Sequence, residues 1–211
     1  DANTLPTGGN IVTGSGVINV NDNVMNINTL TDKATIRWDS FNIGANASVN
    51  FAMPSTASSV LNRVMGSSKS LIEGVLNANG HVYLVNQNGI YFGAGSQINV
   101  GSLTATTMDN LANSAIEDIY NKGILSNPTA PVFSFADAVG VIDVAGKEVN
   151  LNGQVIKNAA SINTSLGGRV MLLAPDVKNS GLINAPDGQV ILAAGKTIYL
   201  LNGKDMVALV P

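Results

Sequence analysis

The chain has 211 residues, of which 45% are hydrophobic but only 5% aromatic and 12% charged, and its formal net charge at pH 7 is −3. This composition is too apolar for a disordered chain and too poor in basic residues for a nucleic-acid-binding domain. The absence of cysteine excludes disulfides and thiolate metal sites. No apolar run reaches the roughly 18 residues that a membrane-spanning helix needs.

Short apolar runs separated by turns rich in Asn and Gly fill most of the chain, which predicts short β-strands. The chain opens at Asp1 without Met, so we expect a processed or engineered N-terminus. Residues 1–33 are interpreted as an N-terminal cap, because the first coil of a solenoid must be covered. Ala34, Ile36 and Trp38 follow on one face of a half-buried strand, and Trp38 is expected in the core.

Residues 34–107 are predicted to form the first coils, with a short connector at 70–76. Their clearest part is a strand at 80–85 that ends in the turn sequence NQNG at 86–89. Asn tolerates a left-handed backbone and bonds its own main chain, and Gly permits a positive φ. The sequence therefore predicts a tight corner at this turn, fixed by Asn86 and Asn88.

Two short units recur along the chain. The first is a glycine followed by an apolar strand, and it begins at Gly80, Gly168 and Gly188, the last two copies being 20 residues apart. The second unit ends in Ile-Asn, and it occurs at residues 17–19, 97–99, 161–163 and 182–184. A period of about 20 residues with three short strands per turn predicts a parallel β-helix, here of about nine or ten coils, in which stacked neighbours bury the apolar side chains.

The repeated strand also predicts which side chains face the core. Because successive strand residues alternate, two inward columns and one outward polar column are expected. The inward columns are Val82, Val170 and Val190, and Leu84, Leu172 and Leu192; the outward polar residues are His81, Arg169 and Gln189. This leaves an outward apolar column of Tyr83, Met171 and Ile191, which we expect another segment to cover.

Residues 108–135 break the strand pattern and are interpreted as an excursion from the solenoid. Apolar residues at helical spacing between 108 and 121 predict a short helix, with Asp109 or Asn110 as its N-cap. Residues 136–211 are predicted to return to coils. The strands expected there lie at 139–144, 149–151, 155–156, 168–172, 188–192 and 197–201.

Several motifs in family order resemble those of filamentous-haemagglutinin-type exoproteins of two-partner secretion. They are IRWDSFNI (36–43), LNRV (61–64), VNQNGI (85–90), IN (98–99) and LTATT (103–107). The resemblance covers most of residues 10–110 and is closer to the high-molecular-weight adhesin branch. Gln87 stands where the family usually has Pro, and the N-P-N-L motif is absent between Asn50 and Asn62, so the motif names transfer only in part.

The resemblance implies an all-β, right-handed parallel β-helix, and the crossover rule for parallel strands favours the same hand. It implies that residues 1–211 form one secretion domain, which directs a longer adhesin-like exoprotein to a dedicated outer-membrane transporter and nucleates its folding. The unfolded chain would cross the periplasm, meet the transporter's periplasmic domains and fold at the cell surface or outside. The residues of the secretion and structural motifs would be Asn62, Arg63, Asn86, Gln87, Asn88, Gly89 and Ile90.

Two other functions remain open: a carbohydrate-binding adhesin domain, with host or matrix glycans as partners of the full-length protein, and a β-helix carbohydrate-active enzyme. The residues offer little for catalysis. His81, the only histidine, is expected to be an outward strand residue, and Glu117 and Asp118 would point to different faces of the helix. We therefore predict no catalytic, cofactor-binding or metal residues and no nucleic-acid partner. We also expect the natural chain to continue past Pro211, with its last coil left open.

Overall fold

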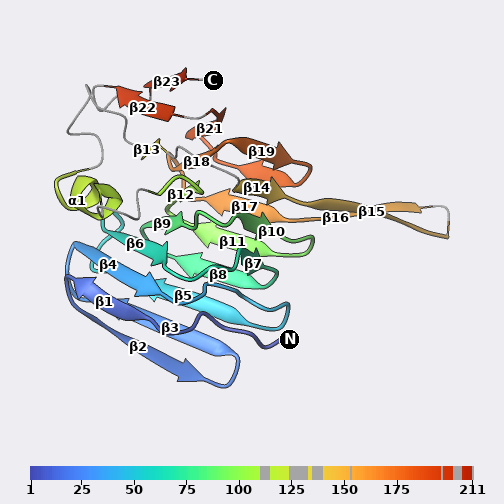
Figure 1. Cartoon of the computed structure of the whole chain (residues 1–211). Helices are drawn as coiled ribbons and strands as arrows, with labels where there is room; N and C mark the ends of the chain where they lie inside the picture. Colours follow the sequence, from blue (N-terminus) through green and yellow to red (C-terminus); the bar gives the residue numbers. More distant parts are fainter. Residues whose placement is uncertain are drawn as a thin grey trace.

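The computed structural model describes residues 1–109, 115–123, 133–134, 140–152, 154–195, 197–201 and 206–210. Three sheets of mostly parallel strands surround one core, and a short helix, α1 (Ala115–Asn121), lies outside them (Figure 1). The first sheet consists, in spatial order, of β1 (Asn10–Thr13), β4 (Lys33–Trp38), β6 (Ser59–Val64), β9 (His81–Val85), β12 (Ser102–Thr106), β18 (Arg169–Ala174) and β21 (Gln189–Ala194).

The other two sheets complete the walls of the solenoid. The second sheet consists of β2 (Gly16–Asn21), β3 (Val24–Thr29), β5 (Ser48–Ala52), β8 (Val75–Ala78), β11 (Gln97–Val100), β17 (Ser161–Thr164) and β20 (Leu182–Asn184). The third sheet consists of β7 (Ser70–Ile72), β10 (Ile90–Phe92), β14 (Val141–Val144) and β19 (Asp176–Asn179).

Each coil passes through the three sheets in turn. From β9 in the first sheet the chain enters β10 in the third and β11 in the second, and β12 then pairs in parallel with β9. The predicted parallel β-helix is confirmed. The predicted number of coils is wrong, because the first sheet contains six parallel strands, β4, β6, β9, β12, β18 and β21. Long segments that leave the solenoid use up the residues that further coils would need.

The N-terminal segment closes the first edges of two sheets with antiparallel strands. β1 pairs antiparallel with β4, and β2 pairs antiparallel with β3. These strands occupy the edges at which a preceding coil would otherwise pair, and an unpaired edge is a site of unwanted association.

The predicted inward columns are present in register. Val82, Val170, Leu84 and Leu172 are at most 1% exposed, as is Trp38. Val190 and Leu192 lie opposite Val170 and Leu172 but are 43% and 44% exposed, because no described strand pairs with the far side of β21. The predicted register is therefore right, whereas the predicted burial is wrong at the last described coil.

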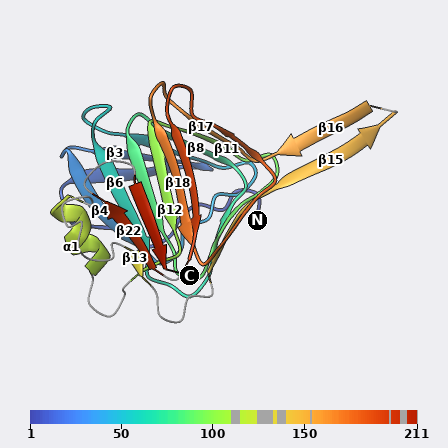
Figure 2. The ribbon, with the colours of Figure 1, turned by 90° about the horizontal axis from the view of Figure 1, so that it is seen from above.

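The outward apolar column is covered by part of the segment at 108–135, which the sequence predicted to leave the solenoid. Met171 is 5% exposed, and Tyr83 and Ile191 pack against the same cluster as Met108, Ile116 and Tyr120. Figure 2 shows α1 beside β4 and β6, on the outer side of the first sheet. The central strands of this sheet are consequently buried on both faces, and every residue of β6 is buried.

Three expectations about local structure are wrong. Residues 70–76, expected as a connector, contain β7 and the start of β8. The residues expected to form coil strands at 149–156 lie in an antiparallel hairpin, β15 (Gly146–Leu151) and β16 (Gln154–Ala159), that projects from the solenoid (Figure 2). The expected coil strand at 197–201 is β22 (Thr197–Leu201), which pairs antiparallel with β23 (Met206–Val210) and β13 (Phe133–Ser134). Alternation shows that a segment is a strand but does not select its partner.

Candidate functional site

The motif residues after β9 form a corner that is bonded to the corner of the preceding coil. Asn86 Nδ2 donates to the carbonyl oxygen of Ser68 and to Ser70 Oγ, both at 3.0 Å. Asn86 Oδ1 accepts from the backbone N–H of Asn88 at 3.0 Å, and Asn88 Nδ2 donates to the carbonyl oxygen of Gly66 at 2.8 Å. The two asparagines therefore shape their own turn and also link it to the coil below.

The rest of this turn is adapted to close stacking. Gly89 has a φ of 122°, in the region that favours glycine, and a Cβ there would lie 3.2 Å from the carbonyl oxygen of Val141 in the following coil. Ile90 is buried and pairs with Ser70 on one side and Ile142 on the other. Gln87 lies in the turn with a half-buried side chain. The structure thus brings four consecutive motif residues and Ile90 together at one corner.

Asn62 and Arg63 are adjacent in β6 but serve opposite faces of the first sheet. Asn62 is fully buried on the core side, where its Oδ1 accepts from Trp38 Nε1 at 3.0 Å and its Nδ2 donates to the carbonyl oxygen of Tyr83 at 3.2 Å. Arg63 is fully buried on the other side, beneath the excursion. Neither side chain belongs to the corner at Asn86, so the predicted motif residues divide among three environments.

Arg63 joins the solenoid to the excursion through a buried charged cluster, which we define as Arg37, Arg63, Asp109 and Glu117. Arg63 Nε donates to Asp109 Oδ2 at 2.9 Å, and Arg63 Nη1 bonds Glu117 Oε2. Arg37 Nη2 lies 2.9 Å from Glu117 Oε1. The side chains of Arg63 and Asp109 are fully buried and that of Glu117 is 8% exposed, whereas that of Arg37 is 40% exposed.

The environment shifts both carboxyl groups of this cluster. Burial raises the pKa of Asp109 above its usual value, although Arg63 acts in the opposite direction. Burial also opposes ionisation of Glu117, but hydrogen bonds and positive charge from Arg37 and Arg63 outweigh it and hold the pKa of Glu117 below its usual value. The cluster contains two cations and two acids, so their formal charges balance.

Only part of this cluster was predictable from the sequence. Glu117 and Asp118 do point to different faces, with Glu117 buried and Asp118 exposed. Asp109, expected as an N-cap, instead bonds Arg63, and the alternative cap Asn110 lies outside the described residues. The cluster could have been predicted from Arg63, because a buried arginine within an apolar strand needs acidic partners from another segment.

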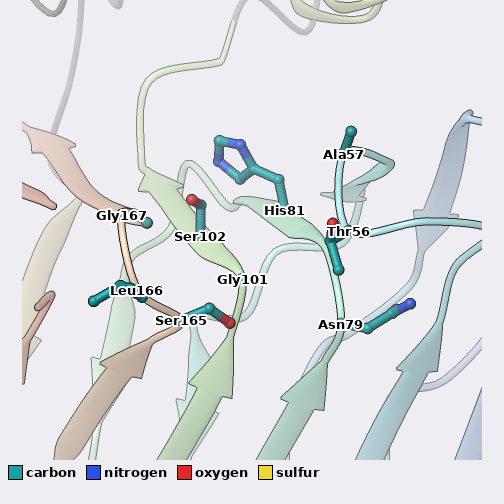
Figure 3. Close-up of a pocket in the computed structure, with 10 residues that line it drawn as sticks. Thr56, Ala57, Asn79, His81, Gly101, Ser102, Ser165, Leu166 and Gly167 are labelled. Atoms are coloured by element: carbon teal, nitrogen blue, oxygen red, sulfur yellow. The ribbon is translucent and has the colours of Figure 1, made fainter. Parts of the chain in front are cut away.

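A hollow of about 440 Å³ opens beside His81, where the second sheet leads into the first (Figure 3). His81 Nε2 lies 2.8 Å from Thr104 Oγ1, and the ring stacks on Tyr83 with centroids 4.0 Å apart. Ser102 Oγ accepts from the backbone N–H of Arg169 at 2.9 Å. Burial, with a smaller effect from Arg169, lowers the pKa of His81 to about 3.

These contacts do not form a nucleophilic triad. His81 is bonded to Thr104 rather than to Ser102, and the residues that line the hollow include no carboxylate. Within the described part of the chain, no three His, Cys, Asp or Glu side chains are grouped as metal ligands. The described helix is too short to cross a membrane.

Comparison with known proteins gives consistent matches. A family model described as "TPS secretion domain" matches residues 2–208. A heme/hemopexin-binding protein of Haemophilus influenzae (strain Rd) is 35% identical over an alignment of 179 positions that covers 81% of this chain and 19% of that protein. A second heme/hemopexin-binding protein of H. influenzae is 47% identical over 85 residues, 40% of this chain and 9% of that protein.

The fold has a close match among solved structures. The crystal structure of the HMW1 secretion domain from H. influenzae superposes with a TM-score of 0.76 at 30% identity, covering 96% of this chain and 47% of that one. The chain thus spans about a fifth of the first curated relative and about half of the solved chain. The matched family and fold describe a secretion domain and not an enzyme.

Proposed function

The chain belongs to the TPS secretion domain family, and from this premise we propose that it directs a longer exoprotein to a dedicated outer-membrane transporter and starts the folding of that exoprotein outside the cell. Exoproteins of two-partner secretion (TPS) are secreted across the outer membrane. The observation that carries the proposal is the family match over residues 2–208, supported by the likeness of the fold to the HMW1 secretion domain. We further propose that residues 1–211 act as one domain.

The physics of the fold supports export before folding. Its coils are joined by parallel strand pairs between residues far apart in sequence, so the solenoid forms only when successive coils are present together. A folded solenoid is too wide for a narrow transporter barrel. Stacking each newly exported coil on the previous one would bury apolar surface, and this free energy favours outward movement without ATP.

We propose that the motif residues act through the fold. Asn86 and Asn88, with Gln87, Gly89 and Ile90, would matter because they hold one corner against its neighbours, which their bonds to residues 66–70 support. Asn62 would matter through its bonds to Trp38 and to the backbone of Tyr83. Arg63 would matter through the charged cluster.

The test is secretion of a reporter passenger fused after residue 211, in cells that do or do not make the cognate transporter. We expect the passenger outside the cell only when both the domain and the transporter are present. The matched controls are the passenger without the domain and the fusion with an unrelated transporter. The proposal would be overturned if the fusion were exported by cells that lack the cognate transporter. It would also be overturned if cells that make only the unrelated transporter exported the fusion.

A further inference from the structure

Six asparagines form a hydrogen-bonded ladder on the outer face of the second sheet. Each lies directly opposite the next in the strand register, one per coil. The members are Asn26, Asn50, Asn77, Asn99, Asn163 and Asn184. Consecutive side chains are joined by Nδ2 to Oδ1 hydrogen bonds of 2.8–3.2 Å. We call this set the asparagine ladder.

The asparagine ladder has a direction. In all five bonds the asparagine of the later coil donates through Nδ2 and that of the earlier coil accepts through Oδ1. The last member, Asn184, therefore donates to Asn163, and its own Oδ1 accepts from no described residue. The end of the ladder at Asn184 is an acceptor that a further amide could use.

Asn184 lies at an end of the solenoid that is also open in other respects. β19, β20 and β21 are the last strands of their three sheets, and Figure 1 shows β22 and β23 above β21 at this end of the molecule. The inward-facing Val190 and Leu192 are 43% and 44% exposed there, although their counterparts one coil below are fully buried. β22 pairs with β13 and β23, and β23 contacts β21, but none of these three strands pairs with β21, so its edge stays unpaired in the described part of the chain. This end thus offers strand edges and unfilled core positions together.

The relatives indicate what occupies such an end. The chain spans only 19% of the first curated relative and 47% of the solved HMW1 chain, so these proteins carry many more residues. A coil from a longer chain matches all three exposed features: strand edges, apolar core positions and an amide acceptor. We propose that the asparagine ladder selects the register of the next coil, by favouring a coil that places an asparagine opposite Asn184. This deepens the proposed function and rests on it, because only a longer exoprotein supplies that coil.

Apolar stacking alone would specify this register poorly. A slip of one residue would turn apolar side chains outward, but a slip of two residues keeps every side chain on its original face. In the first sheet, where valine and leucine alternate at the inward positions of β18 and β21, such a slip replaces one aliphatic residue by another. It would, however, place the incoming asparagine away from Asn184 and leave the amide acceptor without its partner. The asparagine ladder therefore penalises a slip that the inward positions of the first sheet tolerate.

The test uses the intact chain and a synthetic, fluorescently labelled peptide that copies residues 176–194, which contain one strand for each of the three sheets. We expect the peptide to bind the open end. Alanine in place of the peptide's copy of Asn184 should weaken binding about fivefold, as should Asn184→Ala in the protein, because each removes the same hydrogen bond. The two changes together should weaken binding no further than either one. Alanine at the peptide's copy of Lys178, an exposed side chain, is the matched control and should leave binding unchanged.

Three outcomes would overturn the proposal: no binding of the peptide, equal binding of the Asn and Ala peptides, or additive losses in the double change. Sedimentation of the chain without peptide must also show a monomer. If the chain is a dimer that the peptide fails to dissociate, a second copy of the chain occupies this end of the solenoid, and the proposal is wrong. Secretion of the reporter by the Asn184→Ala domain is measured separately, so that failure of the register proposal is distinguished from failure of the secretion proposal.

Discussion

The outer faces of the first and second sheets share the same coil register but have opposite chemistry. The first sheet is covered by the excursion, and its outer face combines an apolar column with the buried charged cluster. The outer face of the second sheet carries the asparagine ladder, whose members are exposed or half-buried. A covered face can gain stability from apolar packing but must neutralise every charge, whereas an open face can carry neutral polar side chains that bond one another.

The largest difference between the faces should appear when one buried charge is removed. Arg63→Ala leaves Asp109 buried without its ion pair, and we expect it to lower the free energy of unfolding by about 3–5 kcal/mol. Arg37→Ala is the matched control: Arg37 is 40% exposed, Glu117 keeps its bond to Arg63, and a loss of about 0–1 kcal/mol is expected. Urea denaturation measures both. Equal losses in the two variants would contradict the role assigned to burial.

A corner that joins the first sheet to the third should be less sensitive than the charged cluster. Asn88→Ala removes the bond to the carbonyl oxygen of Gly66 and should cost about 1–3 kcal/mol. Secretion should fall because folding outside is weakened, while the unfolded variant still binds the transporter's periplasmic domains. Gln87→Ala in the same turn is the control and should cost less. If the Asn88→Ala variant kept wild-type stability but lost binding to the transporter, the transporter would recognise Asn88 directly.

The pH dependence of stability should also separate the covered face from the open one. Burial lowers the pKa of His81 from 6.5 to about 3, so the unfolded chain binds more protons between these values and stability falls as pH falls through that window. Between pH 7 and pH 5 we expect a loss of about 1–2 kcal/mol from this group. Glu117, whose pKa is lowered from 4.5, stabilises the fold above 4.5, and this contribution is lost only at lower pH.

His81→Gln provides the comparison for this effect. The variant should show a smaller loss of stability between pH 7 and pH 5 than the natural sequence, measured by urea denaturation at both values. An identical loss in the two proteins would mean that His81 titrates in the folded state as it does in the unfolded chain.

The smallest effect is expected on the open face. Asn77→Ala breaks two bonds of the asparagine ladder, but the groups left behind are accessible to water, so we expect a cost of about 0.5–1.5 kcal/mol. Asn28, an exposed asparagine of β3 beside the ladder, provides the control, and Asn28→Ala should change stability by less than about 0.5 kcal/mol. A loss for Asn77→Ala as large as that for Arg63→Ala would remove the distinction between the faces.

The sequence by itself determined the class of fold and much of the core. Alternation and the recurring glycine-strand unit placed Val82, Leu84, Val170 and Leu172 inside, and they also identified an apolar column that needed a cover. These features were predictable because facing depends only on the two-residue period of a strand. The corner at residues 86–89 was predictable for a similar reason, since Asn and Gly have local backbone preferences.

The tertiary structure alone decided how strands pair and what meets the outer faces. The hairpin at 146–159 alternates as a coil strand would, yet it pairs with itself, and together with the other segments outside the coils it leaves six coils where nine or ten were expected. The partners of Arg63 come from residues 46 and 54 positions later in the chain. Such contacts depend on which segment folds back over a sheet. That is decided by the free energy of burying whole surfaces, which no local pattern of residues records.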